Sequence, residues 1–252
     1  MIESKDNQIV KHINKLKHKK DRRIHSEYII EGEKIVNEAI EKHKEYLKEI
    51  IVSESYAKRN NIDPNSVILI DDIFDYVTEH KNPEGIIGIM KKKETNNTPD
   101  YTKNLIIVLN EVQDPGNLGN IIRTVDSLDL GQIILSENTV DPYMPKVVRS
   151  TMGSSFRVNI FEEEIKQVLE ELEKHSYEIY SAVLDEDSEN LYQLDTKNKK
   201  VAVIFGNESS GVDPVIQDKT KKLYIPMPGE TESLNVSTSV AIVSYEIYRQ
   251  NL

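Results

Sequence analysis

Apolar residues in the first ninety positions alternate between short extended runs and helical spacing. Four apolar runs predict strands, at residues 28–30, 50–52, 67–70 and 86–90. A helical spacing follows the first strand, at Ile35, Val36, Ala39 and Ile40, and residues 73–77 predict a second, short helix. Strands that alternate with helices indicate a small α/β domain over residues 1–90.

The second half of the chain carries longer apolar runs. They predict strands at residues 105–109, 133–135, 157–160, 177–183, 201–205 and 223–225. Apolar residues three or four positions apart predict helices around residues 121–128, 165–172 and 236–247. Apolar strands separated by helices are typical of a mostly parallel sheet covered on both faces. Ligands of such sheets bind beyond the carboxyl ends of the strands.

A polar segment separates the two halves. Residues 91–104, KKKETNNTPDYTKN, contain one proline and no apolar run, which is typical of an interdomain linker. The sequence therefore predicts an N-terminal domain at 1–90, a linker at 91–104 and a C-terminal domain at 105–252.

Composition narrows the class of protein. With 38% hydrophobic and 30% charged residues, the 252-residue chain can bury an ordinary core. The absence of cysteine excludes disulfides, zinc–thiolate sites and thiol nucleophiles. No apolar run approaches the ~18 residues of a membrane span, and the N-terminus lacks the apolar segment of a secretory signal. We expect a cytoplasmic protein with no membrane partner.

The charge is unevenly distributed. The whole chain carries −11, yet residues 1–25 hold eight lysines or arginines against three acids, so the remainder carries −16. A basic arm on an acidic body suits contact with RNA phosphates at one end of the molecule. The alternative is a solvated amphipathic helix with Ile9, Ile13 and Leu16 facing inward. The sequence leaves both interpretations open.

The first of three polar loops follows the strand at 105–109. Asp114-Pro115-Gly116 predicts a tight turn, and Asn117 predicts a helix N-cap. Arg123 then stands out on a mostly apolar helix. Because Asn117 and Arg123 lie six positions apart, roughly 240° around an ideal helix, a shared site would require Asn117 in a non-helical capping position.

Two further loops follow later strands. Residues 205–212 form a glycine-rich loop with one carboxylate, Glu208, and they lack the Gly-Lys-Ser/Thr of a phosphate-binding P-loop. Pro226 ends the last strand, and Ser233 or Asn235 can cap the final helix. Each loop alone is ambiguous, because a turn with a cap explains most of its residues but not Arg123, nor both Ser233 and Asn235.

Together and in this order, the three loops closely resemble the signature motifs of the SpoU (TrmH-type) family in the SPOUT superfamily of RNA methyltransferases. The matching elements are Asn-x5-Arg at Asn117 and Arg123, Gly-x-Glu at Gly206 and Glu208, and Ile-Pro-Met…Ser-Leu-Asn-Val-Ser at residues 225–237. The resemblance covers about residues 104–252. Residues 1–90 resemble, more loosely, the family's N-terminal substrate-binding domain.

The resemblance implies a SPOUT-type α/β fold with a trefoil knot, and a homodimer whose sites are completed across the interface. Backbone groups of Gly206, Ile225 and Leu234 would hold S-adenosylmethionine. Arg123 matches the catalytic arginine, and the residues expected to orient it and the ribose are Asn117, Glu208, Ser233 and Asn235. No metal is expected, and the 2′-hydroxyl nucleophile implies RNA rather than DNA.

The resemblance suggests that Arg123 activates the hydroxyl. A guanidinium with a pKa above ~12 is a poor base, so we favour a role in holding phosphate and stabilising the developing alkoxide. Ribosomal RNA is favoured over transfer RNA, because a separate N-terminal domain and a length near 250 resemble the family's rRNA branch.

Two other functions compete with this one. A noncatalytic RNA-binding or assembly factor could use the same scaffold, although Arg123, Glu208 and Asn235 are all present. A Rossmann-type dehydrogenase requires Gly-x-Gly-x-x-Gly after the first strand, whereas residues 116–119 are Gly-Asn-Leu-Gly.

Overall fold

The computed structural model describes residues 1–93, 98–185 and 188–252. Its contacts divide the chain into two compact units, the first formed by Met1–Glu94 with Tyr143–Phe156 and the second by Thr95–Pro142 with Arg157–Leu252. Residues 94–97 of the predicted linker lie outside the described residues. The units are defined by contacts alone, and the predicted domain boundaries stay a prediction.

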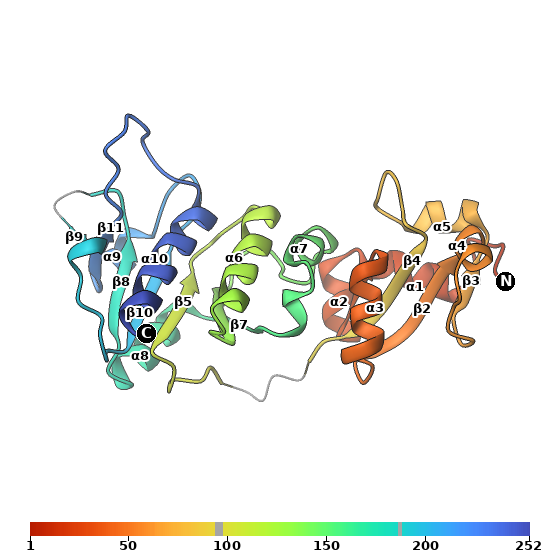
Figure 1. The fold of residues 1–252 in the computed structure, drawn as a ribbon, viewed down its shortest axis with the longest axis horizontal. Helices are drawn as coiled ribbons and strands as arrows, with labels where there is room; N and C mark the ends of the chain where they lie inside the picture. Colours follow the sequence, from red (N-terminus) through yellow and green to blue (C-terminus); the bar gives the residue numbers. More distant parts are fainter. Residues whose placement is uncertain (94–97, 186–187) are drawn as a thin grey trace. The chain divides into compact units, whose positions relative to one another are not determined.

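The first unit is built on a four-stranded sheet in the order β1-β4-β2-β3 (Figure 1). β1 and β2 both pair antiparallel with β4, and β3 runs parallel to β2. The strands are β1 (Glu27–Glu31), β2 (Leu47–Ser53), β3 (Val67–Leu69) and β4 (Ile86–Lys91). All four coincide with the apolar runs, so this part of the prediction is confirmed.

Alternating side chains divide the first unit's apolar residues between two cores. Ile29 of β1 packs on one face of the sheet with α1 and α5, whereas Tyr28 and Ile30 pack on the other face with α3. The helices described between the N-terminus and β4 are α1 (Gln8–Leu16), α2 (Lys19–His25), α3 (Glu33–Lys42), α4 (Glu54–Arg59) and α5 (Asp71–Val77).

The basic N-terminal segment folds onto the first unit as α1 and α2. Val10, Ile13 and Leu16 are fully buried, whereas Ile9 is only partly covered. The Arg22 guanidinium is also buried, and its Nη1 donates to the Leu16 carbonyl at 2.8 Å, at the carboxyl end of α1. The segment is therefore a packed amphipathic helix rather than a free arm, and its exposed lysines still allow contact with nucleic acid.

A distant stretch of chain completes the first unit. Residues 143–156 form α7 (Pro145–Thr151) and the short 3-10 helix η1 (Ser154–Phe156). Val148 and Phe156 enter the core on the α3 side of the sheet, and the Tyr143 ring lies 4.9 Å from that of Tyr28. The first unit thus draws part of its core from residues that follow β6 of the second unit.

The second unit is a seven-stranded sheet in the order β7-β6-β5-β10-β8-β11-β9, and every described strand pair is parallel. Its strands are β5 (Leu105–Leu109), β6 (Gln132–Ser136), β7 (Asn159–Glu163), β8 (Glu178–Ala182), β9 (Glu189–Asn190), β10 (Val201–Phe205) and β11 (Lys221–Tyr224). The parallel sheet is confirmed. β7 begins two residues later and β11 two residues earlier than predicted, and no strand was predicted at β9.

Helices lie on both faces of this sheet (Figure 1). Val168, Leu169 and Leu172 of α8 share one apolar cluster with strands β5, β6, β8 and β10. On the other face, α10 packs against α6 and β5. The helices of this unit are α6 (Pro115–Ser127), α8 (Ile165–Lys174), α9 (Pro214–Gln217) and α10 (Val236–Gln250).

None of the helices within the described residues combines the length and hydropathy required to cross a membrane. Strand order and pairing do not specify how the C-terminal segment threads past neighbouring loops. The trefoil knot therefore stays a prediction.

Candidate active site

The helix that carries Asn117 begins earlier than the sequence predicted. Asp114 is the N-cap of α6, its Oδ1 accepts a hydrogen bond from the Asn117 backbone N–H at 2.8 Å, and Pro115 takes the first helical position. Proline suits that position because its φ is already helical and its missing N–H would have no partner there. The predicted tight turn and the Asn117 cap are therefore wrong. Asn117 lies in the first turn of α6.

A chain of hydrogen bonds joins the three predicted loops through the buried Asn117 side chain. Its Nδ2 donates to Glu208 Oε1 at 2.9 Å, and its Oδ1 accepts from Asn235 Nδ2 at 2.9 Å. These residues are separated by 91 and 118 positions in the sequence. The loops after β5, β10 and β11 thus meet at one point, as the rule for parallel sheets leads one to expect.

Glu208 is held by both of its carboxylate oxygens. Besides Asn117, the backbone N–H of Asp114 donates to Oε1 at 3.0 Å, and that of Gln113 donates to Oε2 at 3.1 Å. Burial alone would raise the pKa of Glu208, but these hydrogen bonds outweigh it and hold the pKa below its ordinary value. Glu208 is therefore an anion that anchors the start of α6.

Asn235 has two roles at once. Its Oδ1 caps α10, accepting from the Ser237 N–H at 2.9 Å and from Ser237 Oγ at 2.7 Å, while its Nδ2 reaches Asn117. The prediction that Ser233 or Asn235 caps the last helix is confirmed for Asn235. Ser233 lines the nearby cavity, and within the described part of the chain its hydroxyl has no hydrogen-bond partner.

Gly206 is required by the shape of its own loop. A Cβ at this position would lie 2.0 Å from the Gly211 carbonyl carbon, because Asn207 and Gly211 exchange backbone hydrogen bonds of 3.0 and 2.9 Å. Gly211 itself has φ +71°, in the left-handed region that favours glycine. The two glycines fold the loop back on itself, and this places Glu208 opposite α6.

Asn207, which the sequence did not single out as a site residue, holds two of these loops together. Its Nδ2 donates to the Glu111 carbonyl at 2.9 Å, and its Oδ1 accepts from Ser209 within its own loop. Glu111 has φ +61°, an uncommon conformation for a non-glycine residue. Its N–H donates to Ser136 Oγ at 2.9 Å. An asparagine in a glycine-rich turn is a recognisable signal for such local hydrogen bonds.

Next to this network lies a cavity of about 840 Å³ at the carboxyl ends of β8, β10 and β11. It brings together all three residues predicted to hold a cofactor, Gly206, Ile225 and Leu234. Its ionisable lining residues are Asp185, Glu208, Glu232 and Lys222. The excess of carboxylates suits a ligand that carries positive charge, and the cavity size suits a nucleoside-sized molecule.

Arg123 lies apart from this group. Its side chain is exposed on α6 and does not line the cavity, although Asn117 on the same helix turns toward Glu208 and Asn235. Among the described residues, no hydrogen bond or ion pair holds its guanidinium. Six of the eight predicted site residues therefore line the cavity, Asn117 links two of them, and Arg123 alone faces elsewhere.

Comparison with known proteins matches both parts of the chain. Residues 104–245 match the SpoU rRNA Methylase family, and residues 7–88 match the MRM3-like substrate binding domain. The chain is 34% identical to the 23S rRNA (guanosine(2553)-2'-O)-methyltransferase RlmP of Bacillus subtilis over 249 residues, which cover 98% of each protein.

Other relatives agree with this match. An AdoMet-bound rRNA methyltransferase from Sinorhizobium meliloti superimposes with a TM-score of 0.83 at 27% identity, covering all of this chain and 98% of the other. The 23S rRNA (guanosine-2'-O-)-methyltransferase RlmB of Acinetobacter baylyi is 28% identical over 151 residues, 59% of this chain and 60% of its own length.

Proposed function

Because this chain belongs to the SpoU rRNA methylase family, we propose that it methylates a ribose 2′-hydroxyl of ribosomal RNA with S-adenosylmethionine as methyl donor. One observation carries the proposal. The hydrogen-bonded chain from Glu208 through Asn117 to Asn235 joins all three motif loops beside a cavity lined by Gly206 and Leu234.

The cavity fits the methyl donor in size and charge. When bound, S-adenosylmethionine supplies an electrophilic methyl group on a positively charged sulfur. Backbone groups of Gly206, Ile225 and Leu234 would hold it, and the carboxylates of Asp185 and Glu232 would favour its positive charge.

In the reaction, the ribose oxygen forms a bond to the methyl carbon as the carbon–sulfur bond breaks, and the hydroxyl proton is lost to solvent. Glu208 is poorly placed to act as the base, since three donors already occupy its two oxygens. Its role is to fix Asn117 and the start of α6. Arg123 would hold the nucleotide phosphate and stabilise the developing alkoxide.

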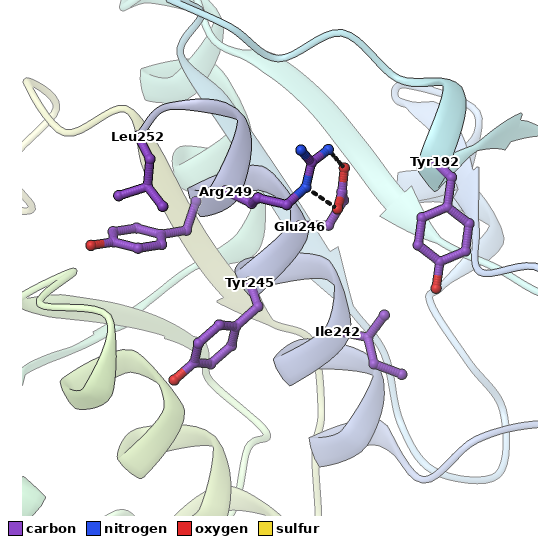
Figure 2. A pocket seen from close by; sticks show the side chains of 7 residues that line it. Tyr192, Ile242, Tyr245, Glu246, Arg249 and Leu252 are labelled. Atoms are coloured by element: carbon purple, nitrogen blue, oxygen red, sulfur yellow. Dashed lines mark hydrogen bonds and ion pairs between the residues drawn. The ribbon is translucent and has the colours of Figure 1, made fainter.

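The position of Arg123 supports a dimeric enzyme. Because this residue does not line the cavity of its own chain, we propose that it serves the site of a second copy. An apolar surface at α10 is available for such an interface, where Ile242, Tyr245 and Leu252 line a cavity of about 490 Å³. Figure 2 shows how these side chains lie. Tyr245 and Leu252 are 51% and 88% exposed, and exposed apolar side chains that lie together mark interaction surfaces.

The dimer can be tested at Tyr245, whose hydroxyl lies 3.2 Å from that of Ser127 on α6. Substitution Tyr245→Glu should shift the protein from dimer to monomer in analytical ultracentrifugation and abolish methyl transfer. Lys166→Glu, an exposed change on α8, is the control and should leave the dimer intact. A wild-type protein that sediments as a monomer while active would refute the shared site.

For the substrate we propose large-subunit ribosomal RNA with a guanosine as the target, because the Bacillus subtilis relative that covers 98% of this chain bears that name. With ribosomal RNA as the substrate, we expect the protein to act in the cytoplasm. Transfer RNA is the alternative, since the two substrates share the ribose nucleophile.

The test is transfer of a radiolabelled methyl group to unmodified 23S, 16S and transfer RNA, followed by alkaline hydrolysis. A 2′-O-methyl group leaves a labelled dinucleotide, because the blocked hydroxyl cannot cleave its neighbouring phosphodiester. Label in mononucleotides would indicate base methylation, and no transfer to any RNA would refute the proposed function.

A further inference from the structure

Glu111 lies two residues beyond the end of β5, in the loop that leads to α6. Its side chain is exposed, and its φ of +61° falls in the left-handed region that residues other than glycine seldom adopt. We propose that the Glu111 carboxylate recognises the guanine base of the nucleotide to be methylated. This inference rests on the proposed function and adds to it a residue that determines specificity.

Hydrogen bonds from two other loops hold the backbone of Glu111 in this conformation. Its N–H donates to Ser136 Oγ at 2.9 Å, and its carbonyl accepts from Asn207 Nδ2 at 2.9 Å. Uncommon backbone conformations persist where their surroundings enforce them, and they are concentrated at ligand-binding and catalytic sites. Glycine would adopt this φ without strain, so a glutamate at this position indicates a use for its side chain.

The carboxylate of Glu111 is oriented by the loop after β6. Asn138 Nδ2 donates to Glu111 Oε1 at 2.9 Å, and the Asn138 carbonyl in turn accepts from Gln113 Nε2. Among the residues that the structure describes, no hydrogen bond or ion pair occupies Glu111 Oε2. The carboxylate is therefore fixed through one oxygen, while the other is open to a ligand.

Glu111 lies next to the methyl-donor cavity without being part of its wall. Asn207, which binds the Glu111 carbonyl, lines that cavity, and so does Glu208, which accepts from the N–H of Gln113 two residues after Glu111. A methyl donor in the cavity would leave the Glu111 side chain uncovered. The acceptor nucleotide has to reach the methyl group from outside the cavity, and Glu111 is an exposed side chain beside it.

The charge of Glu111 determines which part of an RNA it can bind. A carboxylate repels phosphates, and Asp114 and Glu208 add negative charge to the same loops. An ionised carboxylate only accepts hydrogen bonds, so it binds donors such as those on base edges. Contact with the RNA backbone would therefore be unfavourable, whereas contact with a base that presents donors would be favourable.

Guanine presents the donor pattern that suits a carboxylate. Its Watson–Crick edge has two adjacent donors, N1–H and the 2-amino group, and unpaired bases in RNA are commonly recognised on this edge. Adenine and cytosine place an acceptor nitrogen beside their amino group, and uracil has a single N–H between two carbonyls. Each carboxylate oxygen can accept two hydrogen bonds, so Glu111 Oε1 can keep Asn138 and still meet one of the guanine donors.

The test uses unmodified 23S rRNA assembled by ligation around a synthetic segment, with guanosine or inosine at the position that wild type methylates. Inosine keeps the N1–H but lacks the 2-amino group. For wild type, kcat/KM should be about tenfold lower with inosine, because a hydrogen bond to a carboxylate is charge-assisted. Glu111→Gln should lower kcat/KM with guanosine about tenfold and reduce the preference for guanosine over inosine to about twofold.

Two further variants separate recognition from folding. Glu137→Gln makes the same charge change at an exposed residue of the neighbouring loop, and this matched control should keep wild-type kinetics with both RNAs. Glu111→Gly should leave the Tm within about 2 °C of wild type, since glycine accepts φ +61° without strain. It should also leave the Kd for S-adenosylmethionine unchanged while the preference for guanosine is lost.

The outcomes distinguish this inference from the proposed function. Equal methylation of both RNAs by wild type, or an unchanged preference in Glu111→Gln, would overturn the inference. An equal loss of activity with guanosine and inosine would also overturn it, because Glu111 would then act on the ribose or on the fold. Methylation of a nucleotide other than guanosine would overturn the inference alone, whereas a wild type that methylates no RNA would refute the proposed function.

Discussion

Replacing Asn117 by aspartate should make the enzyme pH-dependent in a way that wild type is not. The substitution changes one side-chain NH2 to an oxygen, so the shape of the site is kept. It removes the donor that Glu208 Oε1 receives at 2.9 Å and places a second carboxylate there. The oxygen that accepts from Asn235 is retained. The perturbation is therefore confined to one hydrogen bond between two loops.

The size of the effect follows from the separation. Asn117 is buried and Glu208 is exposed, so we take an effective dielectric constant of about 40, between about 20 near a protein surface and about 80 in water. Two unit charges 2.9 Å apart then repel by about 3 kcal/mol. This repulsion raises the pKa of the introduced carboxyl above its ordinary value. At low pH the pair shares one proton, and the protonated carboxyl donates to Glu208 as the amide does. The penalty is thus largest at alkaline pH and disappears as the pH falls.

The assay is the initial rate of methyl transfer by wild type and Asn117→Asp between pH 5.5 and 8.5, with Tm measured at each pH. The ratio of variant to wild-type rate should be about a hundredfold lower at pH 8 than at pH 5.5. Asn117→Ala, which cannot regain a donor, should be impaired equally at every pH. A ratio for Asn117→Asp that stays constant across this range would refute the proposed link between Asn117 and Glu208.

Three further outcomes are expected. Arg123→Ala should reduce methyl transfer by about 10²–10³-fold while the calorimetric Kd for S-adenosylmethionine stays within about twofold, and full turnover would exclude Arg123 from the chemistry. Gly206→Ala should lower the Tm by about 5 °C and weaken methyl-donor binding, because its Cβ would meet Gly211 backbone at 2.0 Å; an unchanged Tm would contradict the folded-back loop. Glu178→Gln should cost about 1 kcal/mol of unfolding free energy at pH 7, since the hydrogen bond from Lys221 lowers the pKa of Glu178 to about 2. In urea titrations the difference in unfolding free energy between wild type and variant should be present above about pH 4.5 and vanish toward pH 2. A carboxyl whose pKa is lowered in the folded state loses its stabilising effect when it is protonated.

The central strands of the second unit's sheet could be predicted from the sequence because they are continuously apolar, whereas β9 (Glu189–Asn190) has no apolar residue and was not predicted. Residues 105–109 and 201–205 are buried throughout, so a run of five apolar residues marks each strand without reference to the rest of the fold. α7 could not be predicted in the same way. Its apolar residues Val147 and Val148 are adjacent, and Val148 is buried against a sheet formed more than fifty positions earlier in the chain.

The sequence predicted which loops form the candidate site, but not how their side chains are arranged. The motif resemblance identified Asn117, Glu208 and Asn235, whose side chains the structure joins by hydrogen bonds. The cap of α6 was assigned wrongly, because both Asp114 and Asn117 favour capping and only Pro115 distinguishes them. The location of Arg123 outside the cavity depends on the direction of a side chain, which motif spacing does not specify.

The packing of residues 143–156 into the first unit has a practical consequence for anyone dividing this protein. Truncation near residue 100 would leave Val148 and Phe156 without the sheet that buries them, and the excised N-terminal fragment would have a gap where these side chains belong. Each fragment would then expose apolar surface. Insolubility of either fragment would therefore result from the position of the truncation and would not show that the fragment needs RNA to fold. A fragment study should instead graft Tyr143–Phe156 onto the N-terminal piece and bridge its absence in the other with a short glycine–serine loop.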